Sequence, residues 1–305
     1  SHRINPNMLS ATILLFALLS AQGQVPVLAR LRRRRTVWEL PQVAGSHPAV
    51  VASREDEVPR LPSRELVGAG IGVTFGGVRA VDGMDVRVAP GQRVAIMGSN
   101  GAGKTTLVNA LCGFVPLTQG RVTLGDDDIT TMPAFARARA GLGRSFQLPR
   151  LADVLTVRQN VECWHGYSPD LAERLDWLMD RFWVRAVADV PVEMLSFGFR
   201  RRTEIMRALV PLPEVLLLDE PVGGLEDEEV AKLIDVILEL QAEDGWGLLV
   251  IEHNLDFAKG IAEHLMVMQN GTLITEGPVA EVWEDERVRR IYLGETMPAA
   301  AAGAV

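Results

Sequence analysis

From about Glu65 onward, apolar residues fall into short runs separated by glycine, proline and asparagine. The segments "GIGVTF" and "MDVRVAPGQRVAIMG" predict strands with a turn at Pro90-Gly91. The runs in "EVLLLDEP" and "GLLVIEHN" are unbroken, which is typical of strands buried on both faces of a parallel sheet. "MQNGTLI" predicts a hairpin that turns at Asn270-Gly271. This pattern predicts an α/β fold.

A helical pattern dominates the middle of the chain. After the strand-like "GRVTLG", residues 129–191 read as helical, most strongly in "LAERLDWLMDRFWV". A further helix is expected to begin near Ser196. We therefore predict a helical insertion over about residues 129–205.

The N-terminal residues differ in kind from the rest. Residues 8–21 are apolar, and the basic cluster "RLRRRR" follows them, the reverse of the order in a signal peptide. The apolar run is shorter than the ~20 residues of a membrane span, unless it continues past Pro26 to Ala29. Two interpretations of residues 1–35 stay open: an apolar leader, or the remnant of a membrane helix.

Composition excludes some classes of protein. A chain of 305 residues can build a large core, and its net charge of −8 argues against nucleic-acid binding. Its two cysteines, Cys112 and Cys163, have neither metal-binding nor redox spacing, which favours a reducing compartment.

The most specific motif is "GSNGAGKTT", which lies between the apolar "RVAIM" and the helical "TLVNALCGF". It is a phosphate-binding loop in its strand–loop–helix context. Glycines let backbone N–H groups turn toward phosphate oxygens, and the helix dipole favours the same anion. Lys104 is expected to reach the β- and γ-phosphates, and the Thr105 hydroxyl to ligate Mg²⁺. The predicted nucleotide-binding residues of the loop are Gly98, Ser99, Asn100, Gly101, Ala102, Gly103, Lys104, Thr105 and Thr106.

Polar residues also follow two other predicted strands. Asp219 is expected near Mg²⁺, and the next residue, Glu220, is suited to polarise an attacking water. The alternative is that both acids cap the next helix. His253 ends a strand at the edge of the sheet where ligands bind, although a lone histidine is more often structural.

Five motifs stand in order along the chain: "GSNGAGKTT", "GRSFQ", "LSFGF", "LLLDEP" and "IEHN". Together they resemble the ATP-binding subunit of ABC transporters, over about residues 66–297. The resemblance implies a P-loop ATPase fold with a parallel sheet, N-terminal antiparallel strands and the helical insertion, and it implies ATP and Mg²⁺ as cofactors. The expected organisation is a linker at 36–64, an ATP-binding domain at 65–297 and a disordered tail at 298–305.

The resemblance also implies roles outside the phosphate loop. Phe75 matches an aromatic residue that stacks on adenine, and Gln147 a glutamine that touches Mg²⁺ and the attacking water. Glu220 matches the general base, and His253 the switch histidine that contacts the γ-phosphate. The expected catalytic residues are thus Glu220, His253 and Gln147, and the expected Mg²⁺ ligands are Thr105, Gln147 and Asp219.

The stretch "LSFGF" matches the signature that covers the ATP held by the opposite subunit, through Ser196 and Gly198. Phe199 stands where the family has a glutamine that completes a capping box with the serine, and its loss is expected to cost roughly 0.5–1 kcal/mol. Ser196 is still expected to act as the cap. Glu226 falls where the family usually has aspartate.

The phrases "FGGVRAVDGMDV", "GLGRSFQ", "LTVRQNV" and "DERVRRIYLGE" look like the importers of branched-chain amino acids and urea. The resemblance implies a head-to-tail dimer, a membrane permease and, indirectly, a solute-binding protein. The expected location is the cytoplasmic face of the inner membrane, either peripheral or fused to a permease. The segment "LPRLADVLTV" after Gln147, with Leu148, Leu151 and Leu155, is the expected permease dock.

Three other classes of function compete with the transport ATPase. A soluble ABC protein of DNA repair or translation would carry two cassettes or a long coiled-coil insertion, and the sequence shows neither. A small-molecule kinase would share the phosphate loop but would leave the signature and His253 unexplained. A degenerate subunit that binds nucleotide and hydrolyses it poorly is opposed by the presence of both Glu220 and His253.

Overall fold

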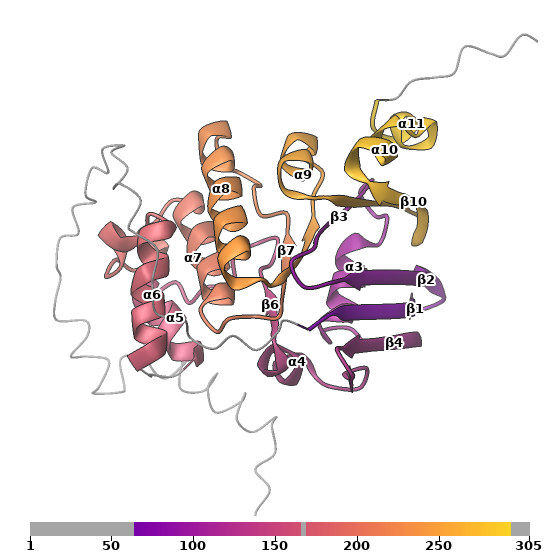
Figure 1. Ribbon diagram of the computed structural model, residues 1–305. Coiled ribbons are helices and arrows are strands. Elements are labelled where there is room, and N and C mark those ends of the chain that lie inside the picture. The colour runs from indigo at the N-terminus through magenta and orange to yellow at the C-terminus, as the bar shows by residue number, and fades with distance from the viewer. Residues whose placement is uncertain (1–63, 166–168, 294–305) are drawn as a thin grey trace, which may run out of the picture. The chain divides into compact units, whose positions relative to one another are not determined.

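The computed structural model of the protein, drawn in Figure 1, describes residues 64–165 and 169–293. The predicted leader and tail, and all of the predicted linker except Arg64, lie outside these residues. In chain order the elements are β1 (Leu66–Phe75), β2 (Val78–Val88), β3 (Arg93–Gly98), α3 (Lys104–Leu111), β4 (Gln119–Leu124), β5 (Asp127–Asp128), α4 (Ala134–Ala140), β6 (Leu142–Arg144), α5 (Val157–His165), α6 (Pro169–Arg181), η1 (Arg185–Val187), η2 (Val192–Met194), α7 (Phe197–Leu209), β7 (Val215–Asp219), α8 (Asp227–Asp244), β8 (Gly247–Ile251), α9 (Leu255–Ile261), β9 (His264–Gln269), β10 (Thr272–Pro278), α10 (Val279–Glu284) and α11 (Glu286–Leu293).

The larger sheet has six strands in the order β10-β9-β3-β8-β7-β6. All neighbouring pairs are parallel except β9 with β10. Because the carboxyl ends of parallel strands meet at one edge, the segments after β3, β6, β7 and β8 come together there. The predicted parallel sheet is confirmed, and this edge positions the site.

Both faces of this sheet are buried. Alternate residues of one strand point to opposite faces, so Val94 and Ile96 of β3 join one apolar core while Ala95 and Met97 join the other. The first core lies against α3 and the smaller sheet, and the second lies under α5 to α9 (Figure 1). Burial on both sides explains the unbroken apolar runs in the sequence.

The smaller sheet is antiparallel, with strand order β2-β1-β4-β5, and confirms the strands expected at the start of the domain. The predicted β9–β10 hairpin is also present, with Asn270 at φ 50° and Gly271 at φ 82°. The Gly271 N–H donates to Ala102 O at 2.9 Å, and Gly271 O accepts from Asp82 N at 2.9 Å. This turn therefore ties the phosphate loop to the smaller sheet.

The region predicted as a helical insertion contains α4 to α7 but also one strand of the core. Residues 142–144 form β6, which pairs with β7 at the edge of the large sheet, so the helical prediction is wrong there. Three residues after a short helix give too little pattern for a strand to be recognised. The helices that lie away from the sheet in Figure 1 begin only after β6.

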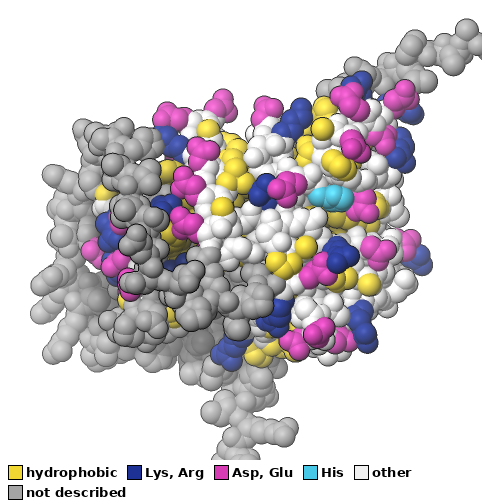
Figure 2. Space-filling view, in the orientation of Figure 1, with side chains coloured by type: hydrophobic (Ala, Val, Ile, Leu, Met, Phe, Trp, Pro, Cys, Tyr) yellow, Lys and Arg dark blue, Asp and Glu magenta, His cyan; other side chains and the backbone are white. Residues whose placement is uncertain are grey.

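The surface is mixed in charge. On the face seen in Figure 2, basic and acidic side chains lie close together. Ion pairs join charges of both signs in the described residues, for example Arg181 and Glu239 at 2.9 Å. Within residues 64–165 and 169–293, every helix is too short or too polar to cross a membrane.

Candidate active site

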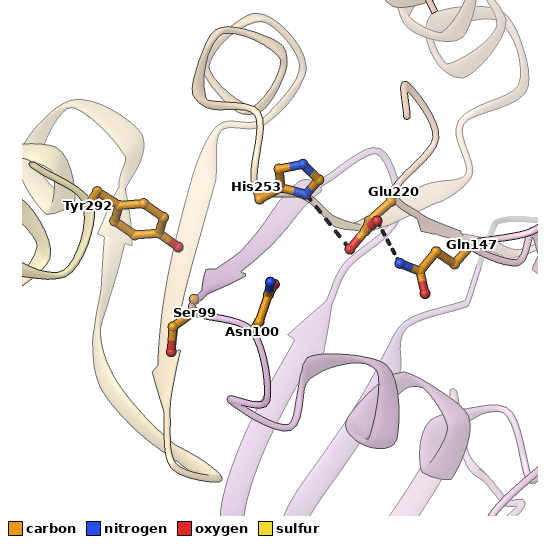
Figure 3. A pocket seen from close by; sticks show the side chains of 7 residues that line it. Ser99, Asn100, Gln147, Glu220, His253 and Tyr292 are labelled. Atoms are coloured by element: carbon orange, nitrogen blue, oxygen red, sulfur yellow. Dashed lines mark hydrogen bonds and ion pairs between the residues drawn. The ribbon is translucent and has the colours of Figure 1, made fainter. Parts of the chain in front are cut away.

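A cavity of about 410 Å³ lies at the carboxyl edge of the large sheet (Figure 3). Its walls come from the loop after β3, the segments after β6, β7 and β8, and helix α11. Six of its seven lining residues were predicted from the sequence as site residues, and Tyr292 was not. The lining residues are Gly98, Ser99, Asn100, Gln147, Glu220, His253 and Tyr292.

The loop after β3 folds as its glycines require. Gly103 has φ 100° at the start of α3, and a Cβ added there would lie 2.3 Å from Ala80 O. A Cβ added to Gly98 would lie 2.2 Å from Met268 O. Both positions therefore exclude any other residue. The loop leads directly into the N-terminus of α3, which suits an anion.

Lys104 opens α3 and is mostly buried, with 8% of its surface exposed. Its Nζ donates to Gly98 O at 2.8 Å and to Ser99 O at 3.1 Å. Burial lowers the Lys104 pKa, and the charges of Glu220 and Asp219 oppose that shift. The ammonium is thus held against the loop, while Thr105, the next residue, is exposed.

Glu220 holds the position between the other two predicted catalytic residues. Gln147 Nε2 donates to its Oε2 at 2.9 Å, and His253 Nδ1 lies 3.7 Å from its Oε1. Glu220 has φ 48°, an uncommon conformation for a residue with a side chain, and its N–H donates to Ile251 O at 2.9 Å. Strained residues of this kind cluster at functional sites. The structure therefore brings the three residues together on one wall of the cavity.

Glu252 is a part of the site that the sequence analysis missed. Its carboxylate is fully buried, and Oε2 accepts from the N–H groups of His253 at 3.0 Å and Asn254 at 3.1 Å. Oε1 accepts from Val222 N at 3.3 Å. Burial raises the Glu252 pKa, and these three hydrogen bonds oppose the shift. One carboxylate thus holds both the His253 segment and the segment after Glu220, and its place beside His253 in "IEHN" was the available signal.

The surroundings of the Asp219 carboxylate show whether the site suits a divalent cation. It is 1% exposed, its Oδ2 lies 3.5 Å from Arg144 Nη2, and its Oδ1 has no hydrogen-bond partner within the described residues. Burial raises the Asp219 pKa, and Arg144 opposes the shift. The described part of the chain holds no group of three acidic, histidine or cysteine side chains arranged for a metal. Mg²⁺ commonly binds one or two carboxylates together with phosphate oxygens, so an unpaired oxygen on Asp219 fits that ion.

The signature residues lie at the start of α7, outside the cavity lining. Ser196 occupies the N-cap position of α7, but its side chain makes no capping hydrogen bond. The prediction that the Ser196 side chain caps this helix is therefore wrong. Phe199 is half-buried and packs against the core that lies under α5 to α9. The Arg202 guanidinium lies over its ring, 4.5 Å from the ring centre. Phe199 therefore contributes to core packing, in addition to replacing the glutamine of the capping box. Gly198 is buried, and a Cβ there would lie 3.1 Å from Glu229 Oε1.

The other predicted positions are also outside the lining. Phe75 ends β1 and is 50% exposed, which leaves its ring accessible. Glu226 is the N-cap of α8, and its N–H donates to Glu229 Oε2 at 3.3 Å, so it occupies a position where aspartate is also favoured.

The expected docking segment is exposed in part. Leu148 is 73% exposed, whereas Leu151 and Leu155 are half-buried and Leu151 packs against the core. Val154, which the sequence analysis did not single out, is 76% exposed.

Comparison with known proteins agrees with this geometry. The family described as "ABC transporter" matches residues 81–223. The lipopolysaccharide export system ATP-binding protein LptB of Escherichia coli K12 is 35% identical over 238 residues, 75% of this chain and 97% of that protein. The high-affinity branched-chain amino acid transport ATP-binding protein LivG of Escherichia coli K12 is 34% identical, over 74% of this chain and 96% of that protein.

A solved structure is also similar. A nucleotide-free ATP-binding cassette from an ABC transporter matches with a TM-score of 0.69 and 31% identity, over 76% of this chain and all of that one. The motif order, the sheet and these similarities agree. The chain belongs to the ABC transporter family, as one of its ATP-binding proteins, which are transport ATPases.

Proposed function

We propose that this chain hydrolyses ATP with Glu220 as the general base and so drives a solute through a partner permease. The observation that carries the proposal is the cluster of Glu220, Gln147 and His253 on the wall facing the phosphate loop. A protein that binds nucleotide without hydrolysing it would not need a carboxylate that accepts a hydrogen bond from Gln147 and faces His253 at this position.

Each residue then has a distinct task. The loop N–H groups and Lys104 hold the phosphates, with the Lys104 ammonium turning from its own loop carbonyls to phosphate oxygens. Glu220 accepts a proton from the attacking water, Gln147 orients that water, and His253 contacts the γ-phosphate. Thr105, Gln147 and Asp219 would hold Mg²⁺, which supplies positive charge to the oxygens of the terminal phosphates.

Dimerisation completes the proposed site. ABC cassettes work in pairs, and in a head-to-tail pair the exposed Ser196 and the Gly198 backbone of one subunit would cover the ATP of the other. Their position outside the cavity lining of their own chain is compatible with that arrangement. The subunit would sit at the cytoplasmic face of the inner membrane, bound to the permease through the segment after Gln147.

For the solute, we favour a branched-chain amino acid or urea-type amide. This choice is supported by the similarity to LivG and by the sequence phrases that resemble that importer group. Export of a lipid is the second candidate, since LptB is equally similar. The test is uptake of labelled leucine and urea into vesicles that hold the co-encoded permease, its binding protein and this chain. ATP-dependent uptake supports the import proposal, and no uptake of either solute contradicts it.

A degenerate subunit is the remaining alternative within the family. It would bind ATP with normal affinity but release phosphate no faster with the permease than without it. Permease-stimulated phosphate release separates the two readings.

A further inference from the structure

Tyr292 lines the nucleotide cavity from a part of the chain that no phosphate-loop motif includes. It belongs to α11, at the C-terminal end of the described residues. In Figure 3 its ring lies on the side of the cavity opposite Glu220 and Gln147, with its hydroxyl pointing toward the phosphate loop. A C-terminal helix thus places one polar atom beside the loop that holds phosphate.

The Tyr292 ring is fixed in place. It packs against the core that lies under α5 to α9, and its centre lies 5.9 Å from that of the Trp283 ring, at an interplanar angle of 43°. Trp283 in turn lies under the Lys259 ammonium, 5.0 Å from the ring centre. Lys259 belongs to α9, the helix that follows His253. The hydroxyl is therefore held at a set position relative to both the loop and the His253 segment.

The Tyr292 hydroxyl is buried, yet no group among the described residues meets the geometry of a hydrogen bond with it. The backbone amide of Gly98 faces the phenol oxygen, but burial has the larger effect and raises the Tyr292 pKa to about 12. At neutral pH the phenol is protonated, so it can donate a hydrogen bond but cannot act as a base. An unpaired buried hydroxyl is unfavourable, and an acceptor that enters the cavity removes that cost.

We propose that the Tyr292 hydroxyl donates a hydrogen bond to an oxygen of the terminal phosphate of bound ATP. The inference rests on the proposed function, because it takes the cavity to hold the triphosphate. The other lining groups frame that end of the nucleotide: the Ser99 and Asn100 loop, the Glu220 carboxylate and His253. Tyr292 would then be a ligand that distinguishes ATP from ADP, supplied by the C-terminal helix of the same subunit.

The test compares full-length wild type with Tyr292→Phe, which removes one oxygen and keeps the ring. The matched control is Tyr167→Phe, the same change at the chain's other tyrosine. Binding is titrated with Mg²⁺ and either ADP or adenylyl imidodiphosphate, an ATP analogue that is not hydrolysed. We expect Tyr292→Phe to weaken binding of the analogue about tenfold and to leave ADP binding unchanged, the effect of losing one hydrogen bond to a charged acceptor.

The melting temperature without nucleotide supplies a second readout. Because the hydroxyl has no hydrogen-bond partner among the described residues, its removal is expected to leave that temperature equal or slightly higher. Equal weakening of ADP and analogue binding, or no weakening of either, would overturn the assignment to the terminal phosphate. If wild type itself binds neither nucleotide, the proposed function fails, which is a different outcome from wild-type binding that Tyr292→Phe leaves intact.

Discussion

Gln147 donates a 2.9 Å hydrogen bond to Glu220, so the segment that leads to the expected permease dock contacts the proposed general base directly. The same segment is held from the other side by Arg201 of α7, whose guanidinium donates to the main-chain oxygens of Phe146 and Gln147. Glu204, also in α7, accepts from Arg150 N at 2.9 Å. A movement of α7 would therefore displace Gln147 together with the segment after it, which is the proposed permease dock.

Removing the Lys104 ammonium is expected to weaken ATP binding. Lys104→Ala deletes a charge-assisted contact to phosphate worth about 1.5–3 kcal/mol, or about 10- to 150-fold in affinity. Titration with ATP and Mg²⁺ measures the change. Lys232→Ala, at a surface lysine paired with Glu228 on α8, is the control and is expected to bind ATP as wild type does. Unchanged affinity in Lys104→Ala counts against the phosphate-loop assignment.

Restoring the glutamine that the family carries at position 199 is expected to destabilise this protein. Phe199→Gln removes a half-buried ring from the core and its contact with Arg202, and Ser196 makes no capping bond that the glutamine would complement. The free energy of unfolding is expected to fall by about 1–2 kcal/mol, as measured in urea. Phe199→Leu keeps the apolar contact and should lose less. A more stable glutamine variant would show that the capping box matters more than packing.

Stability is expected to depend on pH through Glu252. Its pKa is raised in the folded state, so the folded protein binds this proton more tightly than the unfolded chain does. Its contribution to stability is present below the ordinary value near 4.5 and is lost as pH rises through the raised value. Relative to Glu252→Gln, which cannot ionise, wild type is therefore expected to lose stability from pH 4.5 upward. Parallel curves for the two proteins, from urea unfolding at each pH, would contradict this effect.

The proposed dock can be separated from the core by residue choice. Val154 is 76% exposed and Leu151 packs on the core, so Val154→Asp is expected to abolish permease binding with unchanged melting temperature and basal ATPase activity. Leu151→Asp is expected to lower the melting temperature. Leu212→Asp changes an apolar residue that is 50% exposed elsewhere, and permease binding by that variant is the control. Normal permease binding by Val154→Asp would place the dock on another surface.

The parts of the fold that require particular residue types could be predicted from the sequence. Only glycine fits at Gly98 and Gly103, and buried parallel strands require unbroken apolar runs, so the phosphate loop and the large sheet were predicted. Features that depend on tertiary packing could not be predicted. Strand β6 has three residues, too few to show a periodic pattern. The contacts that Phe199 makes with the core depend on the fold and could not be predicted from the motif. Tyr292 lies 188 positions after Lys104 in the sequence and lines the cavity only because α11 folds back over the loop.

The central claim is that Glu220 activates the water that cleaves ATP. The most direct measurement is steady-state phosphate release from ATP and Mg²⁺ by the purified full chain and by Glu220→Gln, with ATP binding measured on the same samples. The amide is close to isosteric and cannot accept the proton, so we predict unchanged ATP affinity and a loss of at least about 100-fold in phosphate release. Phosphate release by Glu220→Gln at the wild-type rate would contradict the account.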